Sequence, residues 1–141
     1  MNESNEQAYV GLIRAWEDGG SAHVCEKIRE LFTDTTVWVQ TGLPTATGPD
    51  EAIAIVETWA AAFANDELEV RHVASTGDAV LIERFETFRN PDGSVYLGLP
   101  VVGVAEFVDG KIAQWREYYD SSAIPGGTLD ARRSTELVGA P

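Results

Sequence analysis

Three alternating segments separated by two short turns decide the fold: AVLIERFETFR (residues 79–89), VYLGLPVVGVAEFV (95–108) and KIAQWREYYD (111–120). Apolar residues recur in them with the two-residue period of a β-strand. The connections, Asn-Pro-Asp-Gly at 90–93 and Asp-Gly at 109–110, are typical of tight turns. The segments therefore predict consecutive antiparallel strands.

The pattern upstream extends this sheet and adds helices. Residues 68–75 predict one more antiparallel strand, whereas the apolar residues before residue 64 recur mostly with the helical period of about 3.6. The expected elements there are a helix capped by Ser4 and ending near Glu17, a helix from Ser21 to Phe32, a strand from Thr35 to Gln40 and a helix beginning at Gly48-Pro49-Asp50. We therefore predict an α+β fold in which three or four N-terminal helices pack on a curved, mixed but mainly antiparallel sheet shaped like a cone.

Length and charge narrow the class of protein. The 141 residues predict a single domain, with a loop-rich tail at 121–141 that includes one helical turn around 129–136. A net charge of −13 argues against binding to nucleic acid or to an anionic membrane surface. The N-terminal stretch MNESNEQAYV has neither the basic nor the apolar region of a signal peptide, so we expect a soluble, cytoplasmic protein.

Metal and thiol chemistry have little support. Cys25 is the single cysteine and lies on the apolar stripe of a predicted helix, which favours a small core residue. His23 and His72 fall on different elements without matching carboxylates, so we expect neither a metal site nor a cofactor.

The segment 79–89 carries the main candidate site. Arg84 and Glu86 are two residues apart, so both project from one face of the strand together with apolar Ile82 and Phe88. If that face is the concave one, the pair is buried, and a buried guanidinium needs a further partner. Asp120, at the end of the last strand, is the candidate second carboxylate. The alternative is an ordinary cross-strand pair on a solvated face.

Two carboxyl groups bridged by one arginine have a specific chemical use. Their environments can separate the two pKa values, which leaves one protonated acid beside one ionised base. Such a pair can deprotonate a water molecule and protonate an oxygen leaving group in the same event.

The same residues resemble the limonene-1,2-epoxide hydrolase family. The resemblance rests on Glu83-Arg84-Phe85-Glu86, Gly103-Val104, Asp109 to Ile112, Trp115 to Asp120, and the stretch Phe32 to Ala52. It covers about residues 30 to 120 and implies the cone-shaped fold shared with ketosteroid isomerase and SnoaL-type cyclases, which is also called cystatin-like or nuclear transport factor 2-like.

The resemblance implies cofactor-free hydrolysis of a small apolar epoxide to a vicinal diol. By position, Asp120 corresponds to the base that activates water, Glu86 to the acid and Arg84 to the bridging arginine. Trp38 and Gln40 correspond to the Tyr and Asn that help to position the water. Glu86 and Gln40 are each one methylene longer than the family's residue, and the Trp38 indole can donate a hydrogen bond but cannot accept one.

Other reactions fit the same pocket. The pair could isomerise a ketone or close a polyketide ring, and a non-catalytic binding domain on the same fold is a third possibility. Residues expected to line the pocket and contact the substrate are Ile82, Trp59, Phe88, Leu99, Val102 and Tyr118. The resemblance, and apolar residues on both faces of 97–108, also predict a homodimer.

Overall fold

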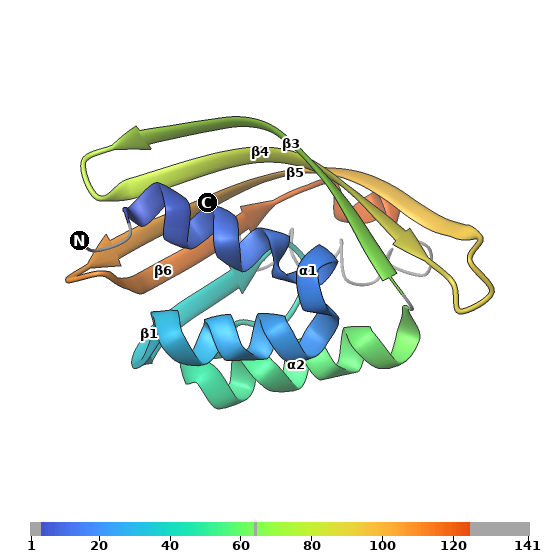
Figure 1. Ribbon diagram of the computed structural model, residues 1–141, viewed down its shortest axis with the longest axis horizontal. Helices are drawn as coiled ribbons and strands as arrows, with labels where there is room; N and C mark the ends of the chain where they lie inside the picture. The colour runs from blue at the N-terminus through green and yellow to red at the C-terminus, as the bar shows by residue number, and fades with distance from the viewer. Residues whose placement is uncertain (1–3, 64, 125–141) are drawn as a thin grey trace.

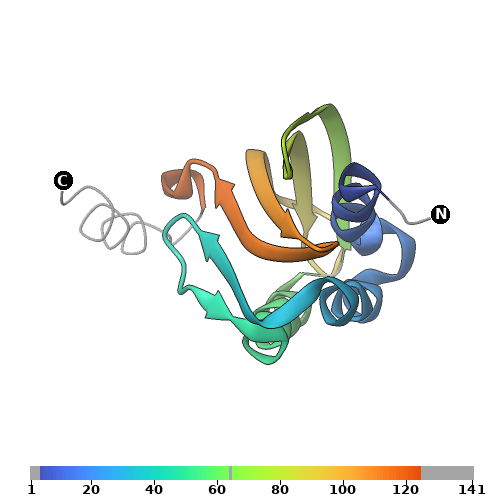
Figure 2. The same ribbon diagram turned by 90° about the vertical axis from the view of Figure 1, so that its left-hand side faces the viewer.

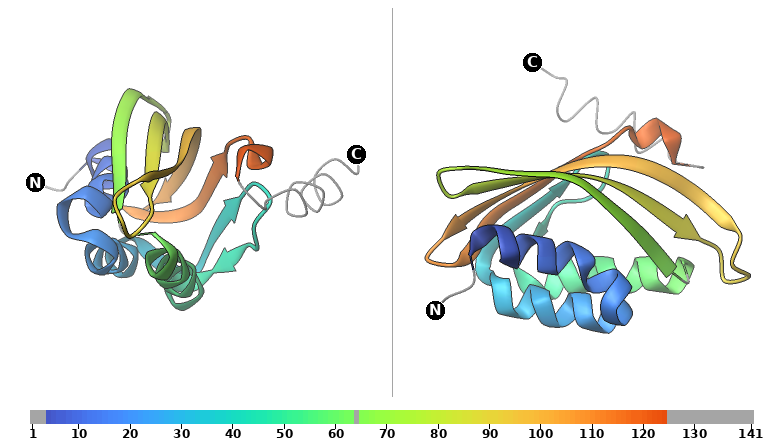
Figure 3. Two further views of the ribbon diagram at one scale, coloured as in Figure 1. Left: turned by 90° about the vertical axis from the view of Figure 1, so that its right-hand side faces the viewer. Right: turned by 45° about the horizontal axis from the view of Figure 1, so that its top comes forward.

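A curved six-stranded sheet carries two helices on one of its faces (Figures 1 and 3). The computed structural model describes residues 4–63 and 65–124. Its elements in chain order are α1 (Asn5–Leu31), β1 (Phe32–Gln40), β2 (Ala46–Thr47), α2 (Gly48–Ala62), β3 (Asn65–Thr76), β4 (Ala79–Arg89), β5 (Val95–Val108), β6 (Lys111–Tyr118) and a 3₁₀ turn, η1 (Ser121–Ala123).

The strand order is β2-β1-β6-β5-β4-β3. The strands β3 to β6 pair antiparallel in sequence order, which confirms the predicted arrangement, and β4 and β5 have the predicted bounds. β1 pairs parallel to β6, so the sheet is mixed. The two-residue strand β2, which lies at the edge beside β1, was not predicted.

The helices are fewer than expected, because the first two predicted helices form one kinked element. The predicted capping box is present: Gln7 N–H donates to Ser4 Oγ, and Ser4 N–H donates to Gln7 Oε1. Gly20 has φ 67° and ψ −158°, a conformation that interrupts the helix and that glycine adopts without steric cost. The chain resumes as a helix directly afterwards, so α1 bends there and continues to Leu31.

The core fills the space between the helices and the concave face of the sheet (Figure 2). Trp115 of β6 lies at its centre: its ring stacks on Trp38 with a centroid distance of 4.4 Å and meets Tyr9 and Phe32 edge-on at 6.1 and 6.2 Å. Aromatic contacts of this kind add to the free energy gained by burying the rings. They also fix β1, β6 and α1 relative to one another.

The last described residues do not form the predicted strand end. β6 ends at Tyr118 rather than at Asp120, and Asp120 instead caps η1 by accepting hydrogen bonds from Ser122 N–H and Oγ. The helical turn predicted around 129–136 lies outside the described residues. No helix among those described is long and apolar enough to cross a membrane.

Candidate active site

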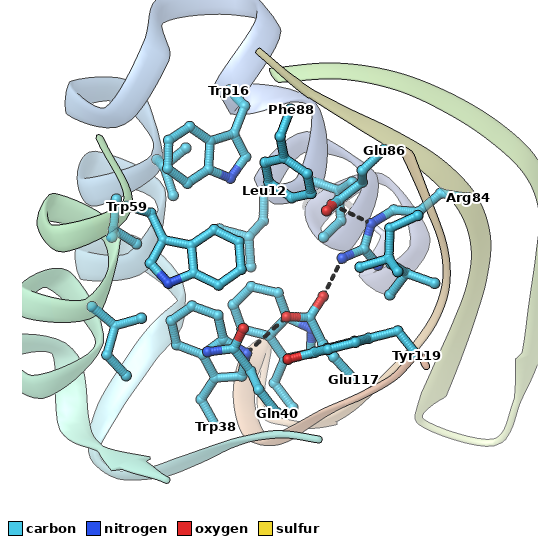
Figure 4. A pocket seen from close by; sticks show the side chains of 17 residues that line it. Leu12, Trp16, Trp38, Gln40, Trp59, Arg84, Glu86, Phe88, Glu117 and Tyr119 are labelled. Atoms are coloured by element: carbon cyan, nitrogen blue, oxygen red, sulfur yellow. Dashed lines mark hydrogen bonds and ion pairs between the residues drawn. The ribbon is translucent and has the colours of Figure 1, made fainter. Parts of the chain in front are cut away.

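Arg84 lies at the centre of a buried cluster of charges. Its Nε donates to Glu86 Oε1 at 2.7 Å, and its Nη2 donates to Glu117 Oε2 (Figure 4). The side chains of Arg84, Glu86 and Glu117 are 3, 11 and 6% exposed. One guanidinium therefore joins two carboxyl groups away from solvent, which is the arrangement that the sequence predicts for a second partner of Arg84.

The strand β5 separates these groups, and a glycine lets them meet. Arg84 lies on β4 and Glu117 on β6, while Gly103 of β5 pairs directly with Glu117. A Cβ atom on Gly103 would lie 3.0 Å from Arg84 Nη1 and 2.1 Å from the Tyr9 hydroxyl. The absence of a side chain at Gly103 thus leaves the space in which Arg84 reaches across the sheet.

Strand β1 supplies two polar side chains beside Glu117. Trp38 Nε1 donates to Glu117 Oε1 at 3.0 Å, so each oxygen of this carboxyl group accepts an N–H. Gln40 pairs with Glu117 in the parallel ladder and is 5% exposed. Its Nε2 is buried and has no hydrogen-bond partner among the described residues. A buried amide N–H of this kind is satisfied by a bound water or ligand oxygen.

Burial and mutual charge set the protonation of the cluster. Burial raises the pKa of Glu117 above its ordinary value of 4.5, since it outweighs the attraction of Arg84, and the charge of Glu86 adds to the rise. Burial opposes the charge of Arg84, but the attraction of Glu86 and Glu117 outweighs it and keeps the pKa of Arg84 high. The cluster therefore retains a positive arginine, and Glu117 binds its proton more tightly than an exposed glutamate does.

Tyr9 of α1 borders the cluster from below. Its hydroxyl accepts a hydrogen bond from Trp115 Nε1 at 2.9 Å. Burial, and next the charge of Glu117, raise the pKa of Tyr9 well above its ordinary 10.0. The phenol is thus neutral at any physiological pH and does not compete with Glu117 for the proton.

An apolar pocket leads to the carboxyl groups (Figure 4). Its cavity volume is about 50 Å³. Leu12 and Trp16 of α1, Trp59 of α2, and Phe88 and Leu99 of the sheet form walls around the polar cluster. A low-polarity wall strengthens electrostatic interactions at the cluster and favours a neutral, apolar ligand.

Most residues predicted for this site lie together, with Asp120 as the main exception. Trp38, Gln40, Arg84 and Glu86 all line the pocket. Asp120 is exposed and caps η1, so the second carboxyl partner of Arg84 is Glu117 instead. Trp59, Phe88 and Leu99 also line the pocket, as expected.

A bulge in β6 determines which of its residues face the pocket. The ladder pairs Glu106 with Gln114 but Phe107 with Ile112, which leaves Ala113 as an extra residue. Beyond the bulge the alternation of faces is reversed relative to Ile112. Trp115 and Glu117 therefore point inward, and the set containing Asp120 points outward.

Three predicted substrate contacts also lie elsewhere. Ile82 is fully buried in the main core and does not line the pocket. Val102 and Tyr118 pair with each other across β5 and β6 on the outer face, where they are 39 and 52% exposed. Tyr118 lies outside the pocket because, like Asp120, it belongs to the set of residues that the bulge turns outward.

The sequence did hold a signal for the residues that were missed. Trp115, Glu117 and Tyr119 share one face after the bulge, and all three line the pocket. Trp115 lies after the bulge and before Glu117, so its burial marks the inner face of this part of β6, whereas Ile112 precedes the bulge. The sequence gives no sign of the role of Gly103, because that role depends on two side chains from other elements, Tyr9 and Arg84, that occupy the space over it.

No group of three histidine, cysteine or acidic side chains in residues 4–63 and 65–124 is arranged to hold a metal ion. The polar groups of the pocket include one cation, two carboxyl groups, an amide and the Tyr119 hydroxyl. Their chemistry is that of proton transfer and hydrogen bonding.

Comparison with solved structures shows which proteins share this fold. Solved structures with the same fold include a protein described as a SnoaL-like polyketide cyclase from Jannaschia sp. CCS1 (TM-score 0.70, 20% identity, covering 92% of this chain and 97% of that one). An LEH-like epoxide hydrolase from M. tuberculosis has a TM-score of 0.62 and 20% identity over 94 and 97% of the two chains. A protein with a ketosteroid isomerase-like fold from Catenulispora acidiphila DSM 44928 has a TM-score of 0.71 and 16% identity over 86 and 92% of the two chains.

These likenesses establish the fold, and a sequence model is more specific. The model of the limonene-1,2-epoxide hydrolase catalytic domain matches residues 4–129, which include every residue of the buried cluster. The chain belongs to the limonene-1,2-epoxide hydrolase catalytic domain family.

Proposed function

We propose that this protein is a cofactor-independent epoxide hydrolase that adds water to an apolar epoxide and releases a vicinal diol. The observation that carries the proposal is the buried arrangement Glu86–Arg84–Glu117 at the end of an apolar pocket. Membership in the family supports it. The role that the sequence resemblance implied for Asp120 passes to Glu117.

Glu117 is the base in this proposal. Two N–H groups, Trp38 Nε1 and Arg84 Nη2, fix its two oxygens, and the Gln40 amide lies next to it (Figure 4). A water molecule that accepts a hydrogen bond from Gln40 Nε2 and donates one to Glu117 would satisfy the buried amide. The raised pKa of Glu117 makes its carboxylate a stronger base than an exposed one.

Glu86 is the acid. It accepts an N–H from Arg84 through Oε1. Because burial favours a proton on Glu117, the proposal requires this proton to move to Glu86 Oε2 when the substrate binds. The water oxygen bonds to an epoxide carbon while the carbon–oxygen bond of the ring breaks, Glu117 takes a proton from the water, and Glu86 gives its proton to the ring oxygen. Release of the diol leaves Glu117 protonated, the state that its raised pKa favours, and the next substrate again requires transfer of this proton to Glu86.

Hydrolysis in ¹⁸O-labelled water tests this assignment. Limonene, cyclohexene and styrene oxides serve as substrates, with Glu117→Gln and Glu86→Gln as the test variants. We expect both variants to lose about 10²- to 10⁴-fold in rate, the typical contribution of general acid–base catalysis. Both substitutions keep the shape of the side chain, so near-ultraviolet circular dichroism checks that the fold is intact.

Asp120→Asn is the matched control. It removes a carboxylate from the same region of the chain but outside the pocket, and asparagine can still cap η1. We expect turnover within about twofold of the wild type. Full activity of Glu117→Gln, or a loss in Asp120→Asn as large as in Glu117→Gln, would refute the assignment of the base.

A specific observation favours a second candidate, a water-independent reaction such as isomerisation or ring closure. The Trp38 N–H is directed at Glu117, and an indole cannot accept a hydrogen bond from water, so fewer groups position a nucleophilic water. The oxygen label distinguishes the two: a product without ¹⁸O whose formation still requires Glu117 supports the second candidate.

A further inference from the structure

A second cavity adjoins the pocket at its aromatic wall. It has a volume of about 160 Å³, compared with about 50 Å³ for the pocket beside the carboxyl groups. The loop 41–43, the aromatic side chains of Trp59, Phe63 and Phe88, and Leu97 contribute to its lining. We call this space the outer chamber and the pocket at Arg84 the inner pocket.

Two side chains belong to both spaces. Trp59 and Phe88 line the inner pocket and the outer chamber, and their ring centroids are 5.4 Å apart. Trp59 lies across the inner pocket from Arg84 (Figure 4). Phe63 continues the aromatic surface, since its ring lies 5.5 Å from Phe88 and 4.9 Å from Tyr96. The two spaces are therefore adjacent and share these two rings as part of their walls.

The two spaces differ in chemistry. The inner pocket ends at a charged cluster with a buried amide N–H that has no partner among the described residues, so it is suited to an oxygen-bearing group. The outer chamber is lined mainly by aromatic and aliphatic side chains. It is suited to a hydrocarbon, whose transfer from water to such a surface is favourable.

Their sizes indicate how a substrate is divided between them. On the order of 10–15 Å³ of cavity volume accommodates one water molecule, so the inner pocket accommodates a small reacting group and its water. A substrate larger than this reacting group can extend beyond Trp59 and Phe88. The outer chamber offers about three times the volume of the inner pocket for it.

We infer that the outer chamber is a substrate-binding subsite for an apolar chain, so the preferred substrate is elongated, with its reacting oxygen at or near one end. This inference rests on the proposed function for the identity of that oxygen as an epoxide. It specifies the class further: a terminal or near-terminal epoxide on an aliphatic chain. Leu43 and Leu97, which line the outer chamber but not the inner pocket, are the specificity-determining residues.

Binding of straight-chain alcohols tests the outer chamber separately from hydrolysis. Isothermal titration calorimetry measures the affinity of butan-1-ol through decan-1-ol for the wild-type protein. Each methylene that enters the outer chamber should tighten binding about three- to fourfold, until the chamber is filled. Alcohols contain no epoxide, so the result does not depend on whether the protein hydrolyses epoxides.

Polar substitutions locate the effect. Leu43→Gln and Leu97→Gln, both at half-buried positions, should weaken binding of octan-1-ol and decan-1-ol by about tenfold, because each brings an amide into the apolar lining. Val108→Gln is the matched control: Val108 is a 60% exposed aliphatic residue that lines neither space, and its replacement should leave all the affinities unchanged.

The possible outcomes separate the two proposals. Affinity that does not rise with chain length, absence of binding by every alcohol, or equal effects of Leu43→Gln and Val108→Gln would overturn the outer chamber as a subsite. Chain-length-dependent binding without epoxide turnover would instead refute the proposed hydrolase activity and leave the subsite in place. Diol formation from epoxides, with alcohol affinities that do not depend on chain length, would support the hydrolase activity and refute the subsite.

Discussion

Two neighbouring residues of β6 take part in two very different ion pairs. Glu117 accepts from Arg84 inside the pocket, where the side chains of the pair are 6 and 3% exposed. Arg116 pairs with Glu106 on the outer face of the sheet, where the side chains are 28 and 47% exposed. The chemistry of the two pairs is the same, since each joins a guanidinium to a carboxylate on adjacent or nearby strands.

Burial makes the difference between them. Water screens the charges of the outer pair and can solvate either one if the other is removed, so the pair contributes little to stability. The inner pair has lost its water, and each charge depends on the other. Burying a charged pair costs desolvation free energy that its attraction only partly offsets, so stability alone does not explain it. Its position at the end of a pocket indicates a chemical role.

The largest expected effect comes from removing each arginine. Arg84→Met should lower the free energy of unfolding by about 3–5 kcal/mol at neutral pH, because two buried carboxyl groups lose their cation. Arg116→Met should cost less than about 1 kcal/mol. Urea denaturation followed by circular dichroism measures both. Equal losses in the two variants would mean that burial does not distinguish the pairs.

Glycine substitutions give a smaller effect that sharpens the comparison. Gly103→Ala should cost about 1–3 kcal/mol, since the new Cβ would overlap the Tyr9 hydroxyl and approach Arg84 Nη1. Gly98→Ala, on the same strand, places its Cβ 2.8 Å from Cζ of the half-buried Phe85, a side-chain end that can move. We expect Gly98→Ala to cost about 0.5 kcal/mol or less by the same measurement.

The difference between Gly103→Ala and Gly98→Ala is the informative quantity. A Gly103→Ala protein as stable and as active as the wild type would show that Arg84 reaches Glu117 without needing the open space over β5.

The smallest expected effect is a pH dependence of stability. Because the pKa of Glu117 is raised by folding, the folded state binds its proton more tightly than the unfolded state does. The free energy of unfolding should therefore fall as pH rises above the unfolded value of about 4.5. Glu117→Gln should remove this part of the slope, and Glu106→Gln on the outer face should not.

Denaturation of the three proteins across this pH range checks the expectation. If the free energy of unfolding changes with pH equally in the wild type and in Glu117→Gln, then folding does not raise the pKa of Glu117.

The predictability of the site differs between its two strands. On β4 the alternation is regular, so Arg84 and Glu86 were correctly placed on one face beside Phe88. On β6, Asp120 was selected from its place at the end of the predicted strand and from the family resemblance, whereas the bulge at Ala113 turns Glu117 to the inner face. A one-residue irregularity moves every later side chain to the other face, so sequence parity is dependable only where the ladder is regular.

The helical region shows a similar division. Local rules correctly predicted the capping box at Ser4 and the break near Gly20, because both depend on a few adjacent residues. Whether the break separates two helices or bends one depends on how both halves pack on the sheet. That packing involves residues far apart in the chain, so the number of helices was predicted less accurately than their positions.

The α+β class, the antiparallel strands β3 to β6 and the Arg-x-Glu pair on one face could all be read from the chain, since each follows from periodicity and turn chemistry within a short segment. Three features depend on packing between distant elements: Glu117 completes the cluster, Gly103 leaves the space for it, and the inner pocket adjoins an outer chamber at Trp59 and Phe88. These features arise where distant strands and helices meet, and their distances are set by packing rather than by local sequence.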